Sequence, residues 1–550
     1  MEFAPIAEEF VYSLLAYSPA LATQVGYHTH KGASLDSQLD DYSAGSIETQ
    51  RKFFSEFRAR MEKMGRDALS AEDRADYDII SDQIAVALLE FDTIQSYRHN
   101  PTIYVELIGN ALFAPYVLEY APKADRYRHI IGRLERIPAL LDQARKNLVD
   151  APDVWNAVAR EENDGNIGLV DKTLRDGAPA ELKDAYEKAA TTALGVLRGF
   201  NDWLKSDLSK RTSDWRLGKQ KYADKFRYVL AIGQSPEQLL KRAEAELESV
   251  RRDMYKLSSG KDAPADAAEL NRVVAAKLAE IAKRHATPEK YFDDARRDLQ
   301  ETREFVRAKN LLALPARDNL QVIETPEFMR GIYAVGGFNP APALEPKLGA
   351  FYWITPISKD WPKERIESKL REYNYYGLKL LTIHEAMPGH YVQFEYANDV
   401  QPPVRRLLRT VLGNGPYVEG WAVYATEMML DEGYLNNDPN LRLTFQKQQL
   451  RMIANAILDV RMQTMGMTDE QAMDLMIRNT FQEKEEATAK LQRAKLSSCQ
   501  LPTYYSGWLG WREIREARRK QGAGFKLNEF HERAMKEAAV PLPVLGRLLQ

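Results

Sequence analysis

Two histidines and a glutamate lie close together in the segment His-Glu-Ala-Met-Pro-Gly-His, which begins at His384 and ends at His390. Zinc peptidases with the pattern H-E-x-x-H place two imidazoles one helical turn apart on the metal, and the glutamate between them faces the metal-bound water. Glu385 has the position of that glutamate in this chain. The residue types therefore fit metal-assisted hydrolysis.

The spacing of the two histidines differs from that pattern, because they are six positions apart. On a regular helix this separation corresponds to about 600° of rotation and ~9 Å of rise, so both rings could not reach one ion. Pro388 cannot donate to the helical hydrogen-bond ladder, and Gly389 tolerates unusual dihedral angles. We therefore expect a bulge that absorbs the two extra residues and brings His390 to the position of an i+4 histidine.

Chance does not readily produce this pattern. With 8 histidines and 79 acidic residues among 550 positions, about 0.02 matches to H-[D/E]-x4-H are expected at random. The alternative interpretation is two hydrogen-bonded, half-buried histidines beside a kink in a helix.

A tetrahedral zinc site needs a third protein ligand and keeps its fourth position for water. The best candidate is Glu419, 29 residues beyond His390, because a Gly/Pro-rich run ending at Pro416 predicts the start of a second helix just before it. Glu427 lies two turns further on and is the alternative ligand, or a hydrogen-bond partner for a ligand imidazole. Both glutamates could instead be solvated helix acids.

The bulk properties exclude several classes of protein. The chain has 550 residues, 44% of them hydrophobic and 28% charged, and a net charge of −3. This length and composition predict a globular protein of two or more domains or lobes. The small net charge argues against a nucleic-acid-binding surface. The single cysteine, Cys499, excludes an internal disulfide.

No run of eighteen apolar residues is present, so we expect no membrane span. The first twenty residues lack a basic n-region. As written, the sequence predicts a cytoplasmic protein, or a periplasmic or secreted one if a signal peptide has been removed.

The elements that must position these residues are mostly helices. Capping patterns predict where several helices begin. They are Ser70 with Asp73, the capping box Ser235-Pro-Glu-Gln238, the capping box of Thr468 with Gln471, and Thr287-Pro288. Residues 311–362 are rich in proline and β-branched or aromatic runs, which predicts loops and one small sheet beside the site.

Further segments add to the central motif. They are EGWAVYATE at 419–427, QLPTYYSG at 500–507, Phe530-His531 with Val540-Pro-Leu-Pro, and Pro19-Ala-Leu-Ala-Thr23 with Gly26. Together they resemble a bacterial family long labelled a domain of unknown function, DUF885, which is grouped with the zincin-like metallopeptidases of the gluzincin type.

The resemblance implies a role for each matching residue. His384, His390 and Glu419 become the ligands of one zinc ion, and Glu385 becomes the general base. The resemblance also suggests which residues stabilise the oxyanion and what the fold is. Tyr504 is the candidate donor to the oxyanion, with His531 a possible second donor and a buried structural role the alternative for each. The expected fold is mainly α-helical and two-lobed, with a helical lobe at 1–310 and a catalytic lobe at 311–550.

The chain departs from the family pattern at three places. Many relatives have a glutamate where this chain has Thr426, and the acid here is shifted to Glu427. Asn455 and Asp459 stand where aspartate and histidine often do. Arg451 matches, and either binds a substrate carboxylate or forms a structural ion pair.

The leading hypothesis is zinc-dependent hydrolysis of an amide bond in small or extended peptides. The first alternative is hydrolysis of a non-peptide amide or ester by the same groups. The second is a helical binding protein with a vestigial metal site, against which Glu385 argues because a structural site needs no base. We assign no role to the other histidines, and the sequence does not indicate the oligomeric state.

Overall fold

The computed structural model describes residues 3–330, 335–522 and 524–550. Helices dominate it, and two small sheets account for the strands described, which confirms a mainly α-helical protein with a small sheet.

The first part of the chain is a succession of helices with one short hairpin. Its elements are α1 (Phe3–Tyr17), α2 (Pro19–Gln24), β1 (Thr29–His30), β2 (Ala33–Ser34), α3 (Ala44–Met64), α4 (Ala71–Leu89), α5 (Thr102–Val117), α6 (Lys123–Leu134), α7 (Ile137–Asn147), α8 (Asp153–Gly168), α9 (Arg175–Gly177) and α10 (Lys183–Ser206).

A second set of helices precedes a three-stranded sheet. These elements are α11 (Gly218–Leu230), α12 (Pro236–Ser259), α13 (Ala267–Ala282), α14 (Tyr291–Lys309), β3 (Leu320–Glu324), β4 (Gly336–Asn339) and β5 (Ala350–Ile354).

Helices return after the sheet and continue to the end. They are α15 (Lys363–Glu372), α16 (Tyr375–Glu385), α17 (His390–Ala397), α18 (Pro403–Val411), α19 (Gly415–Asp431), α20 (Pro439–Thr464), α21 (Asp469–Asp474), α22 (Lys484–Leu496), α23 (Pro502–Arg519), α24 (Leu527–Lys536) and α25 (Leu542–Leu548).

Local capping explains where several helices begin. Ser235 and Gln238 form the predicted reciprocal capping box of α12, and Thr468 with Gln471 forms that of α21. Ser70 accepts a hydrogen bond from the Asp73 amide at the start of α4, also as predicted. The prediction at Thr287-Pro288 was wrong in its boundary, because these residues form a turn and α14 begins at Tyr291.

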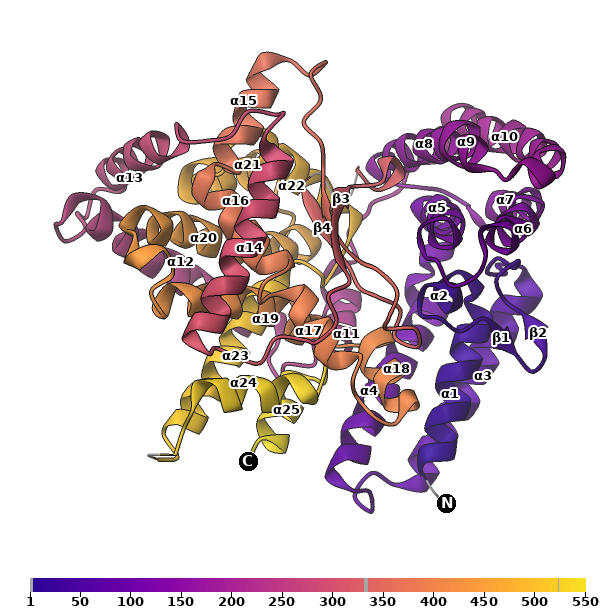
Figure 1. Cartoon of the computed structure of the whole chain (residues 1–550), viewed down its shortest axis with the longest axis horizontal. Helices are drawn as coiled ribbons and strands as arrows, with labels where there is room; N and C mark the ends of the chain where they lie inside the picture. The colour runs from indigo at the N-terminus through magenta and orange to yellow at the C-terminus, as the bar shows by residue number, and fades with distance from the viewer. Residues whose placement is uncertain (1–2, 331–334, 523) are drawn as a thin grey trace.

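The buried apolar side chains form three main hydrophobic cores. One joins α1, α3, α4 and α18, and a second joins α5–α8 and α10. The largest joins α11–α14 with the helices after the sheet. Figure 1 shows α5–α10 on the right, α12–α16 on the left, and strands β3 and β4 between them. The division into two lobes at residue 310 stays a prediction. The packing groups α11–α14, which precede residue 310, with the C-terminal helices.

The three-stranded sheet links two of these cores. Its order is β3-β5-β4, with β3 parallel and β4 antiparallel to the central strand β5. Successive side chains of a strand point to opposite faces. Accordingly Phe351 and Trp353 enter the core of α5–α10, whereas Tyr352 enters the largest core. The Tyr352 hydroxyl is hydrogen-bonded to the Thr382 hydroxyl at 3.2 Å, which ties the sheet to α16.

Helices α19 and α23 approach each other more closely than side chains would allow. A Cβ atom on Gly420 would lie 2.3 Å from the Gly507 carbonyl carbon, and one on Gly507 would lie 2.0 Å from the Pro416 oxygen. Only glycine fits both positions. The two helices are therefore in backbone contact beside the residues predicted to carry the chemistry.

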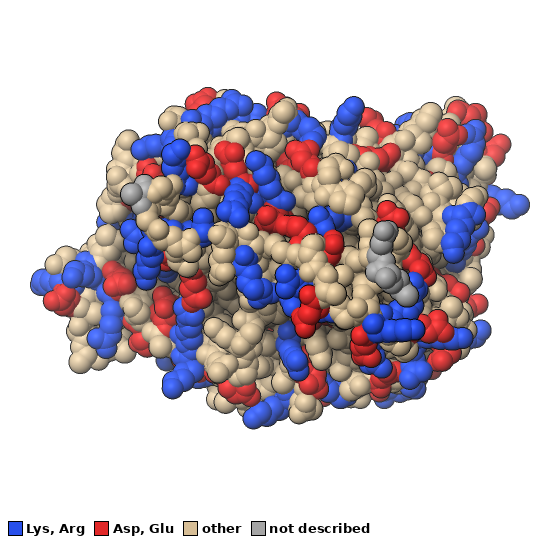
Figure 2. Space-filling model, turned by 90° about the horizontal axis from the view of Figure 1, so that it is seen from below, with Lys and Arg blue, Asp and Glu red and all other residues tan. Residues whose placement is uncertain are grey.

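Among the described helices, none is both long and apolar enough to cross a membrane. Charged side chains of both signs are interspersed on the face shown in Figure 2, without a broad field of one sign.

Candidate metal centre

The chain between the two histidines breaks the helix instead of forming a bulge within it. Helix α16 ends at Glu385, and α17 begins at His390. The amide of Ala386 donates to the carbonyl of Thr382 at 2.9 Å, and the amide of Gly389 donates to that of Ile383 at 2.9 Å. The connection is therefore a tight turn folded back on the last turn of α16, which corrects the expected bulge.

Gly389 is required for this turn. A Cβ atom at this position would lie 1.9 Å from the His384 carbonyl oxygen and 2.3 Å from that of Ile383. The close return of the backbone places the His384 and His390 rings 4.8 Å apart between centroids and almost perpendicular, at 84°. The turn thus achieves what regular helical spacing could not.

Glu419 completes the cluster from α19. Asn414 caps this helix by accepting from the Tyr417 amide, and Pro416 lies in its first turn, so Glu419 is near the helix start as predicted. Glu419 Oε2 lies 3.5 Å from His384 Nε2 and 3.4 Å from His390 Nε2. The three side chains form a group whose ligand atoms lie within 4.8 Å of one another.

These distances suit a shared cation. Zinc ligands at roughly 2.0–2.1 Å in a tetrahedral arrangement are separated from one another by about 3.3–3.4 Å. Glu419 Oε2 is buried and has no hydrogen-bond partner in the part of the chain that the structure describes. Such an atom costs free energy unless something else binds it. Two imidazole nitrogens and one carboxylate oxygen are also the donor set that zinc prefers.

The electrostatics of the cluster depend on mutual contact. Burial by itself raises the pKa of Glu419, but the adjacent imidazoles more than offset this and hold that pKa well below its usual range. Burial lowers the pKa of His390, and the neighbouring Glu419 carboxylate outweighs it and raises this pKa overall. The metal-free cluster therefore holds a carboxylate against a histidine that retains its proton more readily than usual.

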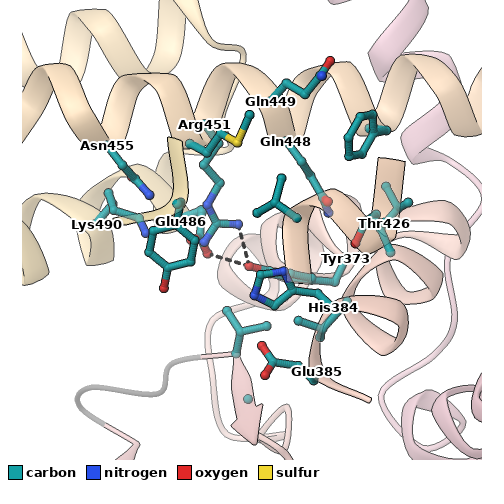
Figure 3. Close-up of a pocket in the computed structure, with 18 of the residues that line it drawn as sticks. Tyr373, His384, Glu385, Thr426, Gln448, Gln449, Arg451, Asn455, Glu486 and Lys490 are labelled. Atoms are coloured by element: carbon teal, nitrogen blue, oxygen red, sulfur yellow. Dashed lines mark hydrogen bonds and ion pairs between the residues drawn. The ribbon is translucent and has the colours of Figure 1, made fainter. Parts of the chain in front are cut away.

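Glu385 lies next to the cluster and lines the adjoining cavity. Within residues 3–330, 335–522 and 524–550, its carboxylate has no hydrogen-bond or ion-pair partner. Figure 3 shows this carboxylate beside the His384 ring at the edge of the cavity. A carboxylate so placed is able to accept a proton from a water held at the cluster.

Tyr504 reaches the cluster from the first turn of α23. Its ring lies 6.3 Å from the His384 ring between centroids, at an interplanar angle of 20°. Its hydroxyl oxygen accepts hydrogen bonds from Arg493 at 3.3 Å and Gln500 at 3.5 Å. Burial raises the pKa of Tyr504 to about 12, so the phenol keeps its proton and can donate it.

The cavity in front of the cluster has an empty volume of about 1120 Å³, which includes space open to solvent. Its walls combine apolar and polar side chains from α16, α19, α20, α22 and α23 (Figure 3). Such a mixture of apolar walls and a few polar groups is typical of sites that bind small ligands.

Comparison with known proteins places the chain in a family. The family model described as "Bacterial protein of unknown function (DUF885)" matches residues 19–549. The chain belongs to the DUF885 family. No curated protein matches it.

Two solved structures resemble this DUF885 chain over its whole length. One is described as "a putative lipoprotein of unknown function from Shewanella oneidensis", with 28% identity, 100% of each chain covered and a TM-score of 0.81. The other is described as "the putative lipoprotein from Colwellia psychrerythraea", with 18% identity, 100% of this chain and 98% of that chain covered, and a TM-score of 0.78. The second similarity supports the fold alone.

His531, the possible second donor of the sequence analysis, lies outside the site of this DUF885 chain and has the buried structural role that was the alternative. This side chain is fully buried and does not line the cavity. Its Nε2 pairs with the Tyr424 hydroxyl at 2.9 Å and its Nδ1 with the Leu311 carbonyl at 2.8 Å. Burial lowers the pKa of His531 to about 4. With both nitrogens engaged inside the core, His531 supports the packing and does not face a substrate.

Two further acids of the sequence analysis also lie elsewhere. Glu427 accepts a hydrogen bond from the Trp508 indole at 2.9 Å and contacts no ligand imidazole, so it is neither ligand nor ligand partner. Asp459 accepts from the Tyr222 hydroxyl and from the Cys499 amide inside the core. Asn455, by contrast, lines the cavity.

Several residues of the cavity wall were not predicted from the sequence, among them Lys490 and Arg493 on α22. With Glu486 they recur at steps of four and three, which places all three on one face of a helix. This periodicity was available in the sequence. Charged residues at such spacing normally mark a solvated face, however, so the pattern did not indicate a buried wall.

Proposed function

We propose that the chain is a zinc-dependent hydrolase, specifically a zincin-like metallopeptidase of two lobes that cleaves an amide bond. The observation that supports it is the convergence of His384, His390 and Glu419 at 3.4–3.5 Å in front of a cavity. The Glu385 carboxylate lies beside them without a partner among the described residues. One zinc ion would be held by the three converging side chains. Their donor set and separations fit it.

When bound, zinc lowers the pKa of a coordinated water and polarises a substrate carbonyl. Glu385 accepts the proton of the attacking water and returns it to the leaving amine. Tyr504 donates its phenolic hydrogen to the oxygen that gains charge as the carbonyl is attacked, which typically stabilises such a transition state by a few kcal/mol. Arg493 and Gln500 orient that phenol by donating to its oxygen.

The shape of the site favours small or extended substrates. The cavity is lined by side chains of α16, α19, α20 and α22, and a site between helices suits a small or extended substrate better than a folded protein. Peptides therefore suit it best. For its location we propose export from the cytoplasm, because the 28% identical structure is described as a lipoprotein.

Metal analysis combined with one substitution tests this function. We expect purified protein to contain about one zinc per chain, and chelation to abolish hydrolysis of a peptide library. Glu385→Gln should lower kcat by at least ~10²-fold while zinc content stays the same, because this residue binds no metal. Glu364→Gln, an exposed glutamate on α15, is the control.

Each contrary result has a definite meaning. Protein without zinc after purification in metal-replete medium refutes the metal centre. Equal activity of Glu385→Gln and wild type removes the general base. If the protein contains zinc and hydrolyses amide or ester probes but no peptide, the substrate is a non-peptide amide or ester. If it contains zinc and hydrolyses nothing, the alternative of a binding protein holds.

A further inference from the structure

One wall of the cavity carries an excess of positive charge. Three basic side chains line it: Arg451 from α20, with Lys490 and Arg493 from α22. We call these three residues the cationic wall. Glu486 is the acid beside it, and Figure 3 shows Arg451, Glu486 and Lys490 on the side of the cavity away from Glu385.

Two of these charges neutralise each other. Arg451 forms an ion pair with Glu486, and it also donates to the Tyr373 hydroxyl at 2.9 Å. Burial alone would raise the pKa of Glu486, but the nearby cations outweigh it and hold this pKa at about 2. The pair is thus a closed structural unit, and it corresponds to the structural ion pair that was one of the two roles expected for Arg451.

Within the described residues, Lys490 has no counter-ion. Its side chain lines the cavity although only 4% of the residue is exposed, and no carboxylate within the described ranges lies within 4.0 Å of its ammonium group. Burial, together with Arg451 and Arg493 nearby, lowers the pKa of Lys490 well below its usual value. The charged form of Lys490 is therefore disfavoured, because no carboxylate of the described residues lies beside it to offset its burial. An anion in the cavity would favour the charged form.

The cationic wall also lies close to the candidate metal centre. The Arg493 guanidinium donates to the Tyr504 hydroxyl at 3.3 Å, and the Tyr504 ring is 6.3 Å from the His384 ring. Lys490 is one helical turn from Arg493 on the same face. Tyr504 thus contacts the cationic wall on one side and the ring of a candidate ligand on the other, so a short extended peptide can reach from this wall to the metal centre.

We propose that Lys490, with Arg493 beside it, binds the free C-terminal carboxylate of a short peptide whose scissile amide lies one or two residues before that carboxylate. This inference rests on the proposed function and makes the site an exopeptidase that works from the C-terminus. A site for a substrate amino group would require unpaired acids here, whereas Glu486 is already paired with Arg451.

The test compares free acids with amides of the same peptides. Zinc-loaded wild type is incubated with a mixture of N-acetylated tripeptides of randomised sequence, prepared once as free acids and once as C-terminal amides. We expect kcat/KM for the acids to exceed that for the amides by about 10–100-fold, the range of a charge-assisted hydrogen bond to a carboxylate. Equal rates for the two sets overturn the inference.

A variant locates the preference. Lys490→Met should abolish the preference by raising KM for the acids about 10–100-fold and leaving the amides unaffected. Lys484→Met, at an exposed position of the same helix, is the matched control and should keep the preference. If Lys490→Met slows acids and amides alike, the residue has a structural role only and the inference fails. The melting temperature of Lys490→Met should not fall, because the change replaces a buried basic group that has no counter-ion among the described residues by an apolar side chain of similar length.

Calorimetry separates this inference from the proposed function. Glu385→Gln protein should bind the acid mixture more tightly than the amide mixture, and Lys490→Met in the same background should remove the difference. If no peptide is hydrolysed and no zinc is found, the proposed function fails, while this binding measurement still decides whether Lys490 recognises a carboxylate.

Discussion

Replacing Gly389 with alanine should damage the proposed metal centre, although Gly389 itself is not one of the proposed ligands. The added Cβ would meet the His384 carbonyl oxygen at 1.9 Å, and real Cβ contacts essentially never fall below 3.0 Å. The turn must therefore open by about 1.1 Å, whereas a metal site tolerates errors of roughly 0.2 Å in its ligand distances. Because His384 precedes this turn and His390 follows it, the opening separates the two imidazoles directly.

We expect the zinc affinity of Gly389→Ala to fall at least ~100-fold, with a loss of about 2–4 kcal/mol in the free energy of unfolding from the strained turn. Competition with a chromophoric chelator measures the affinity, and denaturant unfolding of the metal-free protein measures the stability. The matched control is Gly195→Ala in the middle of α10, where a Cβ meets no atom within 4 Å. This control should stabilise the protein by about 0.5–1 kcal/mol.

Wild-type zinc affinity in Gly389→Ala would refute the reasoning, because it would show that the turn does not set the separation of the ligands. Loss of zinc affinity together with an equal loss in Gly195→Ala would show a general effect of the substitution instead.

Two further predictions concern Tyr504 and His531. Tyr504→Phe should lower kcat by about 10–100-fold with little change in KM or zinc content, because the phenol acts on charge that develops only in the transition state; unchanged kcat would exclude it as the oxyanion donor. His531 has a pKa lowered to about 4 in the folded protein, against 6.5 ordinarily, so its neutral form contributes stability above pH 6.5 that is lost as the pH falls toward 4. This contribution to the free energy of unfolding is about 3 kcal/mol. Denaturant unfolding between pH 4 and 7 should therefore show a flatter pH dependence of stability for His531→Gln than for wild type. Parallel curves would contradict a buried neutral imidazole.

Part of the site could be predicted from the sequence, because its residue types and their spacing are characteristic of metal ligands. His384, Glu385 and His390 are too rare a combination to be incidental, and Pro416 signalled the helix that carries Glu419. The structure brings these residues together as expected. The capping boxes at Ser235 and Thr468 also depend on residues three apart, so their helix starts could be predicted.

The remainder depends on contacts between distant parts of the chain. The turn at Gly389 is shaped by carbonyls of the preceding helix, which no propensity describes. His531 and Asp459 are residues of catalytic type whose partners, Leu311 and Tyr222, lie far away in sequence. Lys490 was missed because a lysine on an amphipathic helix is normally solvated, and only tertiary packing shows that this one is buried.

The contact between Gly420 and Gly507 limits how the protein can change over time. Since no side chain separates α19 from α23, Glu419 and Tyr504 cannot drift apart through compensating changes of residue size. Any widening of the cleft must come from the opposite helices, α20 and α22. Evolution can therefore alter which molecules are admitted by varying those two helices, while the reacting groups keep one fixed spacing.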